Sequence, residues 1–165
     1  MENRKNQAFI LLGSNLGDRL NNLKKAVDGI SDLGNVIRLS GLYRTEPWQM
    51  NSNYWFVNQV LELETPLTPE ALIDKLLLLE SALGRTRTAA EGYQSRIIDI
   101  DILLFNDDMI DTEKLTIPHP RMHLRRFTLM PLAEIAPNKT HPIIKSTSIE
   151  LLQACEDQSE VQRMN

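Results

Sequence analysis

The sequence has little cysteine, few aromatic residues and no long apolar run. Its single cysteine, Cys155, excludes an internal disulfide, and we expect this thiol to pack within a C-terminal helix. The apolar stretch AFILL near the N-terminus spans five residues, which is too short for a signal-peptide core or a membrane span. We therefore expect a cytoplasmic protein that contacts no membrane.

The composition is that of a folded protein with a slight excess of acidic residues. Hydrophobic residues make up 42% and charged residues 24% of the 165 positions, and no low-complexity tract divides the chain. A chain of this length can bury roughly 70% of the surface that its unfolded form exposes, so we predict one domain over residues 1–165. The net charge of −4 disfavours DNA or RNA as a partner.

The pattern of apolar residues predicts the element order β, α, β, β, α, β. Alternating apolar residues indicate strands, and apolar residues that recur every three or four positions indicate helices. The GSN segment reads as a turn that caps the first helix, with close approach of a ligand as the alternative, and Thr68 with Pro69 begins the second helix. The predicted elements are a strand over 8–12 with a turn at Gly13, a helix that reaches Gly34, strands over 35–47 and 56–65, a helix over 70–83 and a strand over 98–105.

This order is typical of a ferredoxin-like α+β sandwich, in which helices cover an antiparallel sheet. We expect its first and last strands to lie beside each other in the middle of the sheet, so that residues 98–105 form a rigid central strand. Beyond that strand we predict a turn at Asn106–Asp108, a loop over 116–123, a short helix around Leu129–Ile135 and a C-terminal helix capped by Ser148.

Two aspartates interrupt the apolar stretch SRIIDIDILLFND. Successive side chains of a strand point to opposite faces. This places Asp99, Asp101, Leu103 and Phe105 on one face and Ile98, Ile100, Ile102 and Leu104 on the other. Neighbouring carboxylates repel each other unless a cation lies between them, and Mg²⁺, which prefers oxygen ligands, suits such a pair. The alternative is that the aspartates only form the polar side of a half-exposed strand.

Arginines on both sides of this strand favour a phosphate-binding site over a merely solvated face. They are Arg85, Arg87, Arg96, Arg121, Arg125 and Arg126. Arginine presents a fork of donors that matches phosphate oxygens, whereas His119 either donates to a phosphate or is a plain turn residue. No G-x-x-x-x-G-K-[ST] phosphate loop occurs in the chain. The residues alone thus predict a metal-dependent enzyme that acts on a phosphoanhydride or phosphoester.

Seven stretches of the chain match motifs of one enzyme family in the same order. They are GSNLGDR, YRTEP, FVNQVLELET, LESALGRTR, SRIIDIDILLFND, LTIPHPRMHLRRF and PLAEIAP, and they cover Phe9 to Pro137. Together they resemble the 6-hydroxymethyl-7,8-dihydropterin pyrophosphokinases of tetrahydrofolate biosynthesis. The resemblance implies the ferredoxin-like fold and a reaction in which ATP gives its terminal diphosphate to the pterin's hydroxymethyl group and leaves AMP.

The resemblance also implies roles for particular residues. Asp99 and Asp101 match the ligands of two Mg²⁺ ions and are catalytic together with Arg85 and Arg96. Pterin contacts are implied at Thr45, Pro47, Trp48, Phe56, Asn58, Asp99 and Phe127, with the ring held between the two phenylalanines. Nucleotide contacts are implied at Glu80, Arg85, Arg87, Arg96, Ile102, Thr116, His119 and Arg125.

Two stretches depart from the family pattern. Tyr93, Gln94 and Ser95 stand where many members have Trp-Gly-Pro, with one extra residue in the loop, and Pro120 stands where some have tyrosine. We expect small-molecule substrates, no nucleic acid and a monomer. Two rival functions are a metal-dependent phosphohydrolase or nuclease, which needs no aromatic sandwich, and a non-catalytic ligand- or RNA-binding module, which would bind without Mg²⁺.

Overall fold

The computed structural model describes residues 5–45, 55–84 and 97–164. Within these ranges, six strands form one antiparallel sheet in the order β5-β1-β4-β3-β8, with β2 also paired to β4. The sheet strands are β1 (Asn6–Ser14), β2 (Asn35–Leu39), β3 (Tyr43–Thr45), β4 (Phe56–Thr65), β5 (Asp99–Phe105) and β8 (Val161–Arg163). The other elements are α1 (Arg19–Ile30), α2 (Pro69–Ala82), the strand pair β6 (Ile110–Asp111) and β7 (Thr116–Ile117), the 3-10 helix η1 (Met122–Leu124), α3 (Arg126–Ile135) and α4 (Ser148–Ala154).

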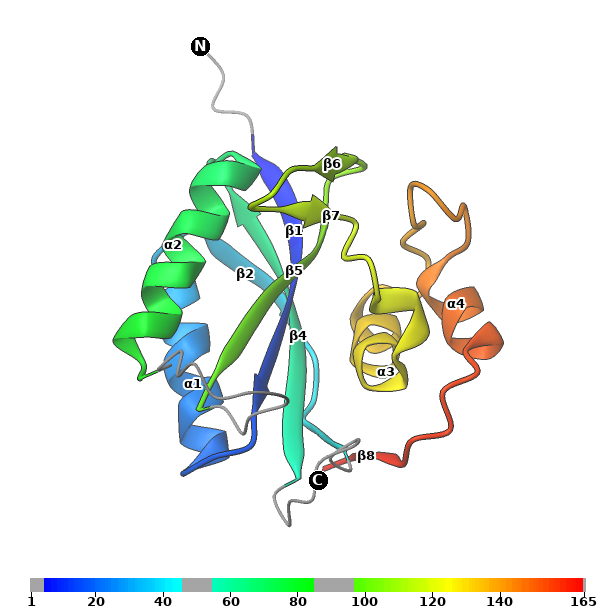
Figure 1. The fold of residues 1–165 in the computed structure, drawn as a ribbon, viewed down its shortest axis with the longest axis horizontal. Coiled ribbons are helices and arrows are strands. Elements are labelled where there is room, and N and C mark those ends of the chain that lie inside the picture. Colours follow the sequence, from blue (N-terminus) through cyan, green and yellow to red (C-terminus); the bar gives the residue numbers. More distant parts are fainter. Residues whose placement is uncertain (1–4, 46–54, 85–96, 165) are drawn as a thin grey trace.

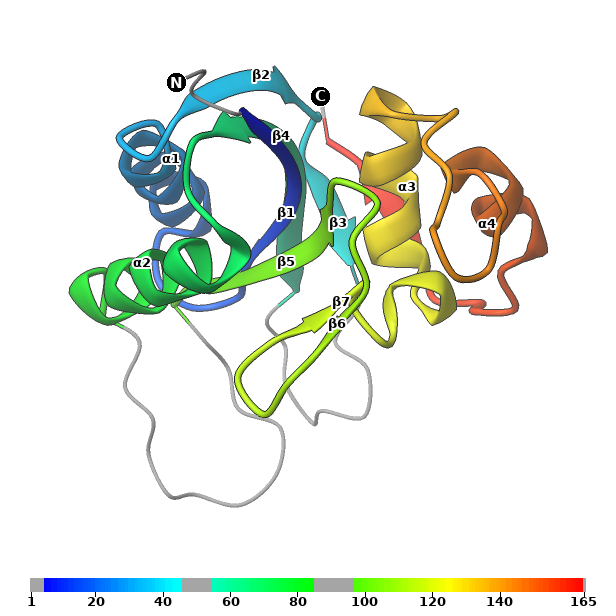
Figure 2. The same ribbon diagram turned by 90° about the horizontal axis from the view of Figure 1, so that it is seen from above.

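The sheet is the middle of three layers. Helices α1 and α2 cover one face, and α3 with α4 lies on the other (Figure 1). The view from above shows the same separation, with α3 next to the sheet and α4 outside it (Figure 2). One apolar cluster, which includes Leu12, Leu61 and Leu76, fills the α1–α2 side, and a second cluster around Leu11 and Leu132 fills the α3 side. The sheet is therefore buried on both faces where α3 covers it, which explains why β4 has almost no exposed position.

The predicted fold class is confirmed, with one correction to the sheet order. The elements β1, α1, β2 with β3, β4, α2 and β5 follow the predicted βαββαβ order, and β1 pairs with β5 as expected. However, β5 is the edge strand of the described sheet and is not central, because the central positions belong to β1 and β4. Support on the open edge of β5 comes from α2, where Glu80 Oε2 accepts a hydrogen bond from the Ile100 backbone N–H at 2.8 Å.

The predicted alternation along β5 fails at its end. The pairing with β1 shifts between Phe9, which faces Leu104, and Ile10, which faces Ile102, so β5 carries one extra residue there. Beyond this irregularity Leu104 packs in the α3-side cluster and Phe105 packs in the α1–α2-side cluster, the reverse of the sequence prediction. A β-bulge of this kind has no marker in the local hydrophobic pattern.

The predicted strand over 35–47 consists of two strands within its described part. Between β2 and β3, Ser40 bonds to Val60 partly through its side chain. Its backbone N–H donates to the Val60 carbonyl at 2.9 Å, whereas the Val60 N–H donates to Ser40 Oγ at 2.9 Å. Gln59 Nε2 also donates to the Ser40 carbonyl at 2.8 Å. Both halves pair with β4, so the predicted pairing of the second and third strands is confirmed.

The predicted turn at Gly13 and the capping role of GSN are wrong. β1 continues through Gly13 to Ser14, and the chain turns at Gly17, whose φ of +67° suits glycine. Asp18 is the N-cap of α1, and its carboxylate accepts from the Asn21 N–H. On α1, Leu23 and Ile30 are buried whereas Leu20 is 49% exposed.

The later helix ends are close to those predicted. Thr68 caps α2 and accepts from the Ala71 N–H, and Gly84 follows the helix with a φ of +102°. The cap of α4 is Thr147, which forms a capping box with Glu150, and not Ser148. Cys155 lies directly after α4 as its C-cap. The turn at 106–108 is confirmed by the hydrogen bond from the Asp108 N–H to the Phe105 carbonyl, and the predicted loop over 116–123 contains β7 and the start of η1.

Among the described residues, no helix combines the length and apolar character needed to cross a membrane.

Candidate active site

Three strands bring polar groups together on the sheet face that α3 covers. Gly13 of β1 pairs with Asn58 of β4 on one side and with Asp99 of β5 on the other. Two residues along, Leu11 pairs with Val60 and with Asp101. Antiparallel register therefore lines up an amide, a glycine and two carboxylates across neighbouring strands, although they are far apart in sequence.

The glycine at position 13 allows the Asn58 side chain to lie across β1. A Cβ atom at Gly13 would stand 2.7 Å from Asn58 Oδ1, which is closer than an ordinary contact. Asn58 Nδ2 donates to Thr45 Oγ1 of β3 at 3.2 Å, and both side chains are buried. These contacts hold the Asn58 amide and the Thr45 hydroxyl in one orientation at the floor of the site.

The aspartates of β5 lie where the sheet face changes from polar to apolar. Asp99 and Asp101 are half-buried, whereas Leu103, the next residue on their face, is buried in the cluster with Leu11 and Leu132. α3 therefore covers the apolar part of the face and leaves the aspartate part open to a cavity. The structure thus places the aspartate pair at the border of the cavity.

A cavity of about 560 Å³ lies over this part of the sheet. Seven predicted site residues line it: Thr45, Phe56, Asn58, Asp99, Asp101, Arg125 and Phe127. Phe56 comes from the first position of β4 and Phe127 from the first turn of α3, so the sheet and a helix of the neighbouring layer each supply one ring. The volume falls in the range of small-molecule binding pockets.

The start of α3 supplies cations to the same cavity. Arg121 and Arg125 line it together with Leu124, and the Arg125 guanidinium lies 5.6 Å from the centre of the Phe127 ring. Two arginines and two aspartates thus provide both signs of charge within one pocket. The pocket can therefore hold an anion and a cation together.

His119 lies close to these charges although it does not line the cavity. Its backbone N–H donates to the Leu103 carbonyl at 2.9 Å, and its Nδ1 accepts from the Arg121 N–H at 3.1 Å. Burial, and then the charges of Arg125 and Arg121, lower the pKa of His119 to about 4, against the opposing effect of Asp99. His119 is therefore neutral at pH 7, and the ring nitrogen Nε2 carries its proton because Nδ1 accepts a hydrogen bond.

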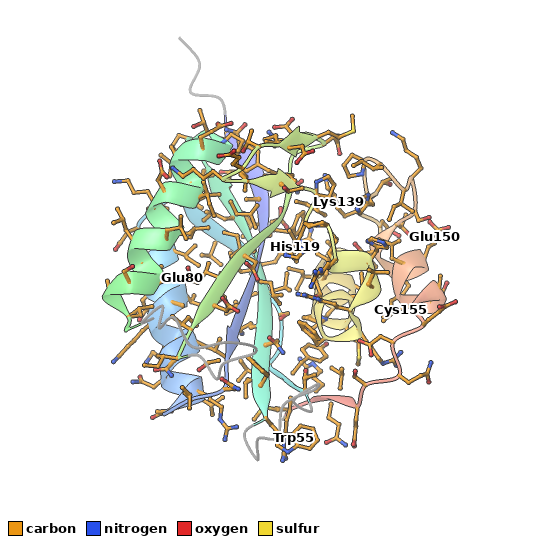
Figure 3. All side chains as sticks on the ribbon, viewed as in Figure 1. Trp55, Glu80, His119, Lys139, Glu150 and Cys155 are labelled. Atoms are coloured by element: carbon orange, nitrogen blue, oxygen red, sulfur yellow. The ribbon has the colours of Figure 1, made fainter. Side chains whose placement is uncertain are left out.

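Besides His119, three further predicted nucleotide contacts lie outside the cavity. Glu80 is 2% exposed on α2, and Ile102 belongs to the apolar cluster on the α1–α2 side. Thr116 is exposed on β7, where it pairs with Asp111. Figure 3 shows Glu80 on the α2 side of the sheet and His119 on the opposite side. The structure thus separates these positions from the pterin-contact positions.

Five predicted site residues lie outside the described residues: Arg85, Arg87, Arg96, Pro47 and Trp48. Their assignments stay predictions. The departures from the family pattern at Tyr93, Gln94 and Ser95 also lie there.

Sequence reasoning missed several residues that line the cavity. They are Leu11, Gly13, Arg121, Leu124, Asp157, Gln158 and Ser159. The alternative interpretation of GSN as a close approach to a ligand pointed to Gly13, and Arg121 belonged to the recognised group of arginines without a role. No local signal marks residues 157–159, because their position depends on the return of the C-terminal segment to β3.

The carboxylates of Asp99 and Asp101 have the donor chemistry for Mg²⁺. Within the described ranges, no group of three or more His, Cys, Asp or Glu side chains is arranged to hold a metal ion. Mg²⁺ usually binds through one or two carboxylates and completes its six ligands with water and substrate phosphate. A pair of oxygen ligands at the border of a cavity with room for a substrate therefore fits this ion.

Comparison with known proteins agrees with this geometry. A family model described as 7,8-dihydro-6-hydroxymethylpterin-pyrophosphokinase matches residues 9–137, which include β1 through α3. The chain belongs to this pyrophosphokinase family. It is 43% identical over 132 residues to the 2-amino-4-hydroxy-6-hydroxymethyldihydropteridine pyrophosphokinase of Bacillus subtilis, covering 79% of this chain and 78% of that protein. The protein of the same description from Aquifex aeolicus is 37% identical over 137 residues, covering 83% of this chain and 84% of the relative.

Solved structures show the same fold for this pyrophosphokinase. The Plasmodium falciparum HPPK-DHPS structure with pteroate superimposes with a TM-score of 0.75 at 17% identity, covering 93% of this chain. The wild-type structure of that protein with STZ-DHP gives a TM-score of 0.73 at 18% identity, covering 92% of this chain. The pyrophosphokinase spans 45% and 43% of those two solved chains, so it corresponds to one part of each.

Proposed function

We propose that this pyrophosphokinase transfers diphosphate from ATP to the hydroxymethyl group of 6-hydroxymethyl-7,8-dihydropterin in folate synthesis. One observation carries the proposal, namely that a single cavity joins the aspartate pair to two aromatic rings and a fixed amide. A hydrolase acting on phosphoesters needs the carboxylates but needs no aromatic sandwich. A transferase needs both, because it must place a second substrate beside the phosphates.

The pterin occupies the part of the cavity next to β3 and β4. A flat heterocycle binds well between Phe56 and Phe127, which approach from different layers. The Asn58 amide presents a donor and an acceptor toward the edge of the ring, and Thr45 fixes its orientation. Pro47 and Trp48 are proposed as further edge contacts.

Asp99 and Asp101 are proposed to hold two Mg²⁺ ions. When bound, Mg²⁺ neutralises phosphate charge and lowers the pKa of the pterin hydroxyl. The carboxylates lie on the edge strand β5, whose backbone is tied to α2 through Glu80, so their separation is maintained without the ligand. Substitution of either aspartate leaves the aromatic part of the cavity in place.

The phosphate groups of ATP are proposed to lie toward Arg121 and Arg125. Arg125 directly precedes α3 and Arg121 directly precedes η1, and both line the same cavity as the aspartates. Neutral His119 has a proton on Nε2 to donate to a phosphate oxygen without adding a fixed charge. Arg85, Arg87 and Arg96 are proposed as further phosphate contacts, and Glu80, Ile102 and Thr116 as contacts of the nucleotide.

The reaction forms one bond and breaks one. The hydroxymethyl oxygen bonds to the β-phosphorus of ATP and releases its proton, while the bond from that phosphorus to the oxygen bridging the α-phosphate breaks. AMP leaves with the bridging oxygen. The arginines offset the charge that develops on the leaving α-phosphate, and the aromatic pair keeps the hydroxymethyl group in line with the phosphorus.

We further propose that residues 1–165 form one domain that works as a cytoplasmic monomer. Strands β1, β3, β4 and β5 of one sheet and residues next to α3 line one cavity, which supports a single domain. The use of ATP as co-substrate supports the proposed cytoplasmic location.

The test is an assay of purified protein with ATP, Mg²⁺ and 6-hydroxymethyl-7,8-dihydropterin, in which AMP and ADP are quantified over time. A parallel reaction omits the pterin. We expect AMP in an amount equal to the pterin diphosphate formed, and only in the complete mixture. ADP or inorganic phosphate released without pterin would instead establish a hydrolase, and the transferase proposal would be abandoned.

A further inference from the structure

We propose that Asp157, in the segment after α4, is a positioning residue that sets the pterin pocket by holding the start of α3. The inference rests on the proposed function, since it concerns the pterin end of the same cavity. The residue acts through its neighbours and does not take part in the chemistry.

The segment lies beyond the part of the chain that the family model matches. That match ends at residue 137, yet Asp157, Gln158 and Ser159 line the cavity together with Thr45 and Phe127. Residues that carry no family motif thus complete the wall of the site.

α3 lacks a cap of its own, and Asp157 supplies one. Among the described residues that begin α3, Arg125 makes no side-chain capping bond and the first turn contains no acidic residue. Asp157 Oδ2 accepts from the Arg126 N–H at 3.0 Å, across 31 positions of sequence. A carboxylate at this place satisfies an open backbone donor and favours the positive end of the helix dipole.

The Asp157 carboxylate is itself held in one orientation. Its Oδ1 accepts from the Ser159 N–H at 2.9 Å and from Ser159 Oγ at 2.5 Å. Burial raises the pKa of Asp157, but the hydrogen bonds from Ser159 and the Arg126 N–H outweigh it and leave this pKa below its ordinary value. The carboxylate is therefore charged at neutral pH, as a helix cap requires.

A second attachment ties the same segment to the opposite wall. β8 pairs with β3, where Val161 faces Thr45 and Arg163 faces Tyr43, and the Met164 N–H donates to the Leu42 carbonyl at 2.8 Å. Figure 2 shows this segment passing from α4 beside α3 to reach β3. Residues 157–163 thus connect the helix that carries Phe127 with the strand that carries Thr45.

Glu134 reinforces this connection at the other end of α3. Its carboxylate accepts from Tyr43 Oη at 2.6 Å, from the Gly41 N–H at 2.9 Å and from Arg163 Nε at 3.1 Å. α3 is therefore fixed to β3 and β8 near its C-terminus, whereas its N-terminal turn depends on Asp157. Loss of the Asp157 carboxylate frees the turn that carries Arg125 and Phe127, while the rest of the helix stays in place.

The test compares four full-length proteins: wild type, Asp157→Ala, Asp157→Asn and Glu156→Ala. Glu156 is the adjacent exposed carboxylate and controls for loss of one negative charge in the segment. Pterin affinity is measured by fluorescence titration without ATP, and kcat and KM for pterin are measured in the AMP assay. Thermal unfolding shows that each protein is folded. Ser159→Ala, which removes one contact to Asp157, serves as a second variant if Asp157→Ala does not fold.

We expect Asp157→Ala to weaken pterin binding about tenfold, as for loss of a helix cap that orders a binding residue. KM for pterin should rise more than kcat falls. Asp157→Asn keeps an oxygen acceptor and should stay within about threefold of wild type, and Glu156→Ala should match wild type. Equal pterin affinity in Asp157→Ala and Glu156→Ala would overturn the proposal.

The two proposals fail in different ways. If wild type forms no pterin-dependent AMP, the proposed function fails, and the direct titration still measures the effect of Asp157 on the pocket. If wild type is active and Asp157→Ala binds pterin normally, only the positioning role fails. A fall in kcat with unchanged pterin affinity would also refute positioning of the pterin pocket.

Discussion

Replacement of Gly13 by alanine should damage the pterin pocket while the protein still folds. The added Cβ would stand 2.7 Å from Asn58 Oδ1, whereas ordinary van der Waals contact begins at 3.4 Å, so the oxygen must retreat by about 0.7 Å (3.4 − 2.7). Asn58 Nδ2 donates to Thr45 Oγ1 at 3.2 Å, and a movement of this size breaks that bond. The Asn58 amide then loses the orientation in which it meets the pterin edge.

The size of the effect follows from the lost hydrogen bond. A buried polar group left without its partner costs about 1–3 kcal/mol, which corresponds to a roughly fivefold to 150-fold weaker pterin affinity. The loss of folding stability is smaller than this cost, because alanine within a strand is favoured over glycine by roughly 0.5–1 kcal/mol. We therefore expect the free energy of unfolding of Gly13→Ala to fall by about 0 to 2.5 kcal/mol (from 1 − 1 to 3 − 0.5).

A double-mutant cycle with Asn58→Ala tests the cause. Pterin affinity is measured by fluorescence titration and stability by denaturant unfolding for wild type, the two single variants and the double variant. With alanine at position 58 the new methyl group meets no oxygen, so Gly13→Ala should add little further loss, and the coupling should be about 1 kcal/mol or more. Unchanged pterin affinity in Gly13→Ala, or strictly additive losses, would refute this account of Gly13.

Three further predictions concern the metal pair, the α3–β3 contact and acid stability. Asp99→Asn or Asp101→Asn should lower turnover by roughly a thousandfold or more with an unchanged melting temperature. Asp108 is an exposed carboxylate in the following turn, so Asp108→Asn should have no effect. Near-normal turnover in either the Asp99 or the Asp101 variant would remove the metal assignment. Glu134→Ala should lower the free energy of unfolding by about 1–2 kcal/mol, because three hydrogen bonds at a partly solvated site are lost, and Glu134→Gln should lose less; an unchanged denaturation midpoint would contradict this. Burial, and then the charge of His123, lower the pKa of His141 below 6.5. Below that pH the unfolded chain binds the proton more readily, so the stability of the folded protein falls on acidification. The loss of stability between pH 7.5 and pH 5 should be smaller in His141→Asn than in wild type, and equal losses would exclude His141 as the cause.

The strands and helices were predictable wherever one local pattern dominates. The aspartate strand shows this clearly, because period-two alternation from Ile98 to Leu103 correctly separated the carboxylates from the isoleucines. The cap at Thr68 and the stop at Gly84 also depend on neighbouring residues alone, and both are confirmed. The bulge near Leu104 was not predictable, because it reflects how β5 and β1 fit together and leaves every residue in the stretch apolar.

Residues of the candidate site were predictable where they lie in a stretch that resembles the family. Thr45, Phe56, Asn58 and Phe127 lie in stretches that resemble the family, and the structure brings them into one cavity. Their own neighbours would have favoured ordinary core packing for the phenylalanines. Nothing in the sequence around Asp157 indicates that its carboxylate caps a helix 31 positions earlier.

The sequence by itself determined the element types, the shared face of Asp99 and Asp101 and the family, because each depends on periodicity or on a short motif. Tertiary structure alone decided that β5 is an edge strand held by α2 and that Asn58 faces Asp99 across Gly13. It also decided that the C-terminal segment closes the pocket by pairing with β3. These features depend on strand order, register and contacts between distant segments, which arise when packed layers satisfy backbone donors and bury apolar faces together.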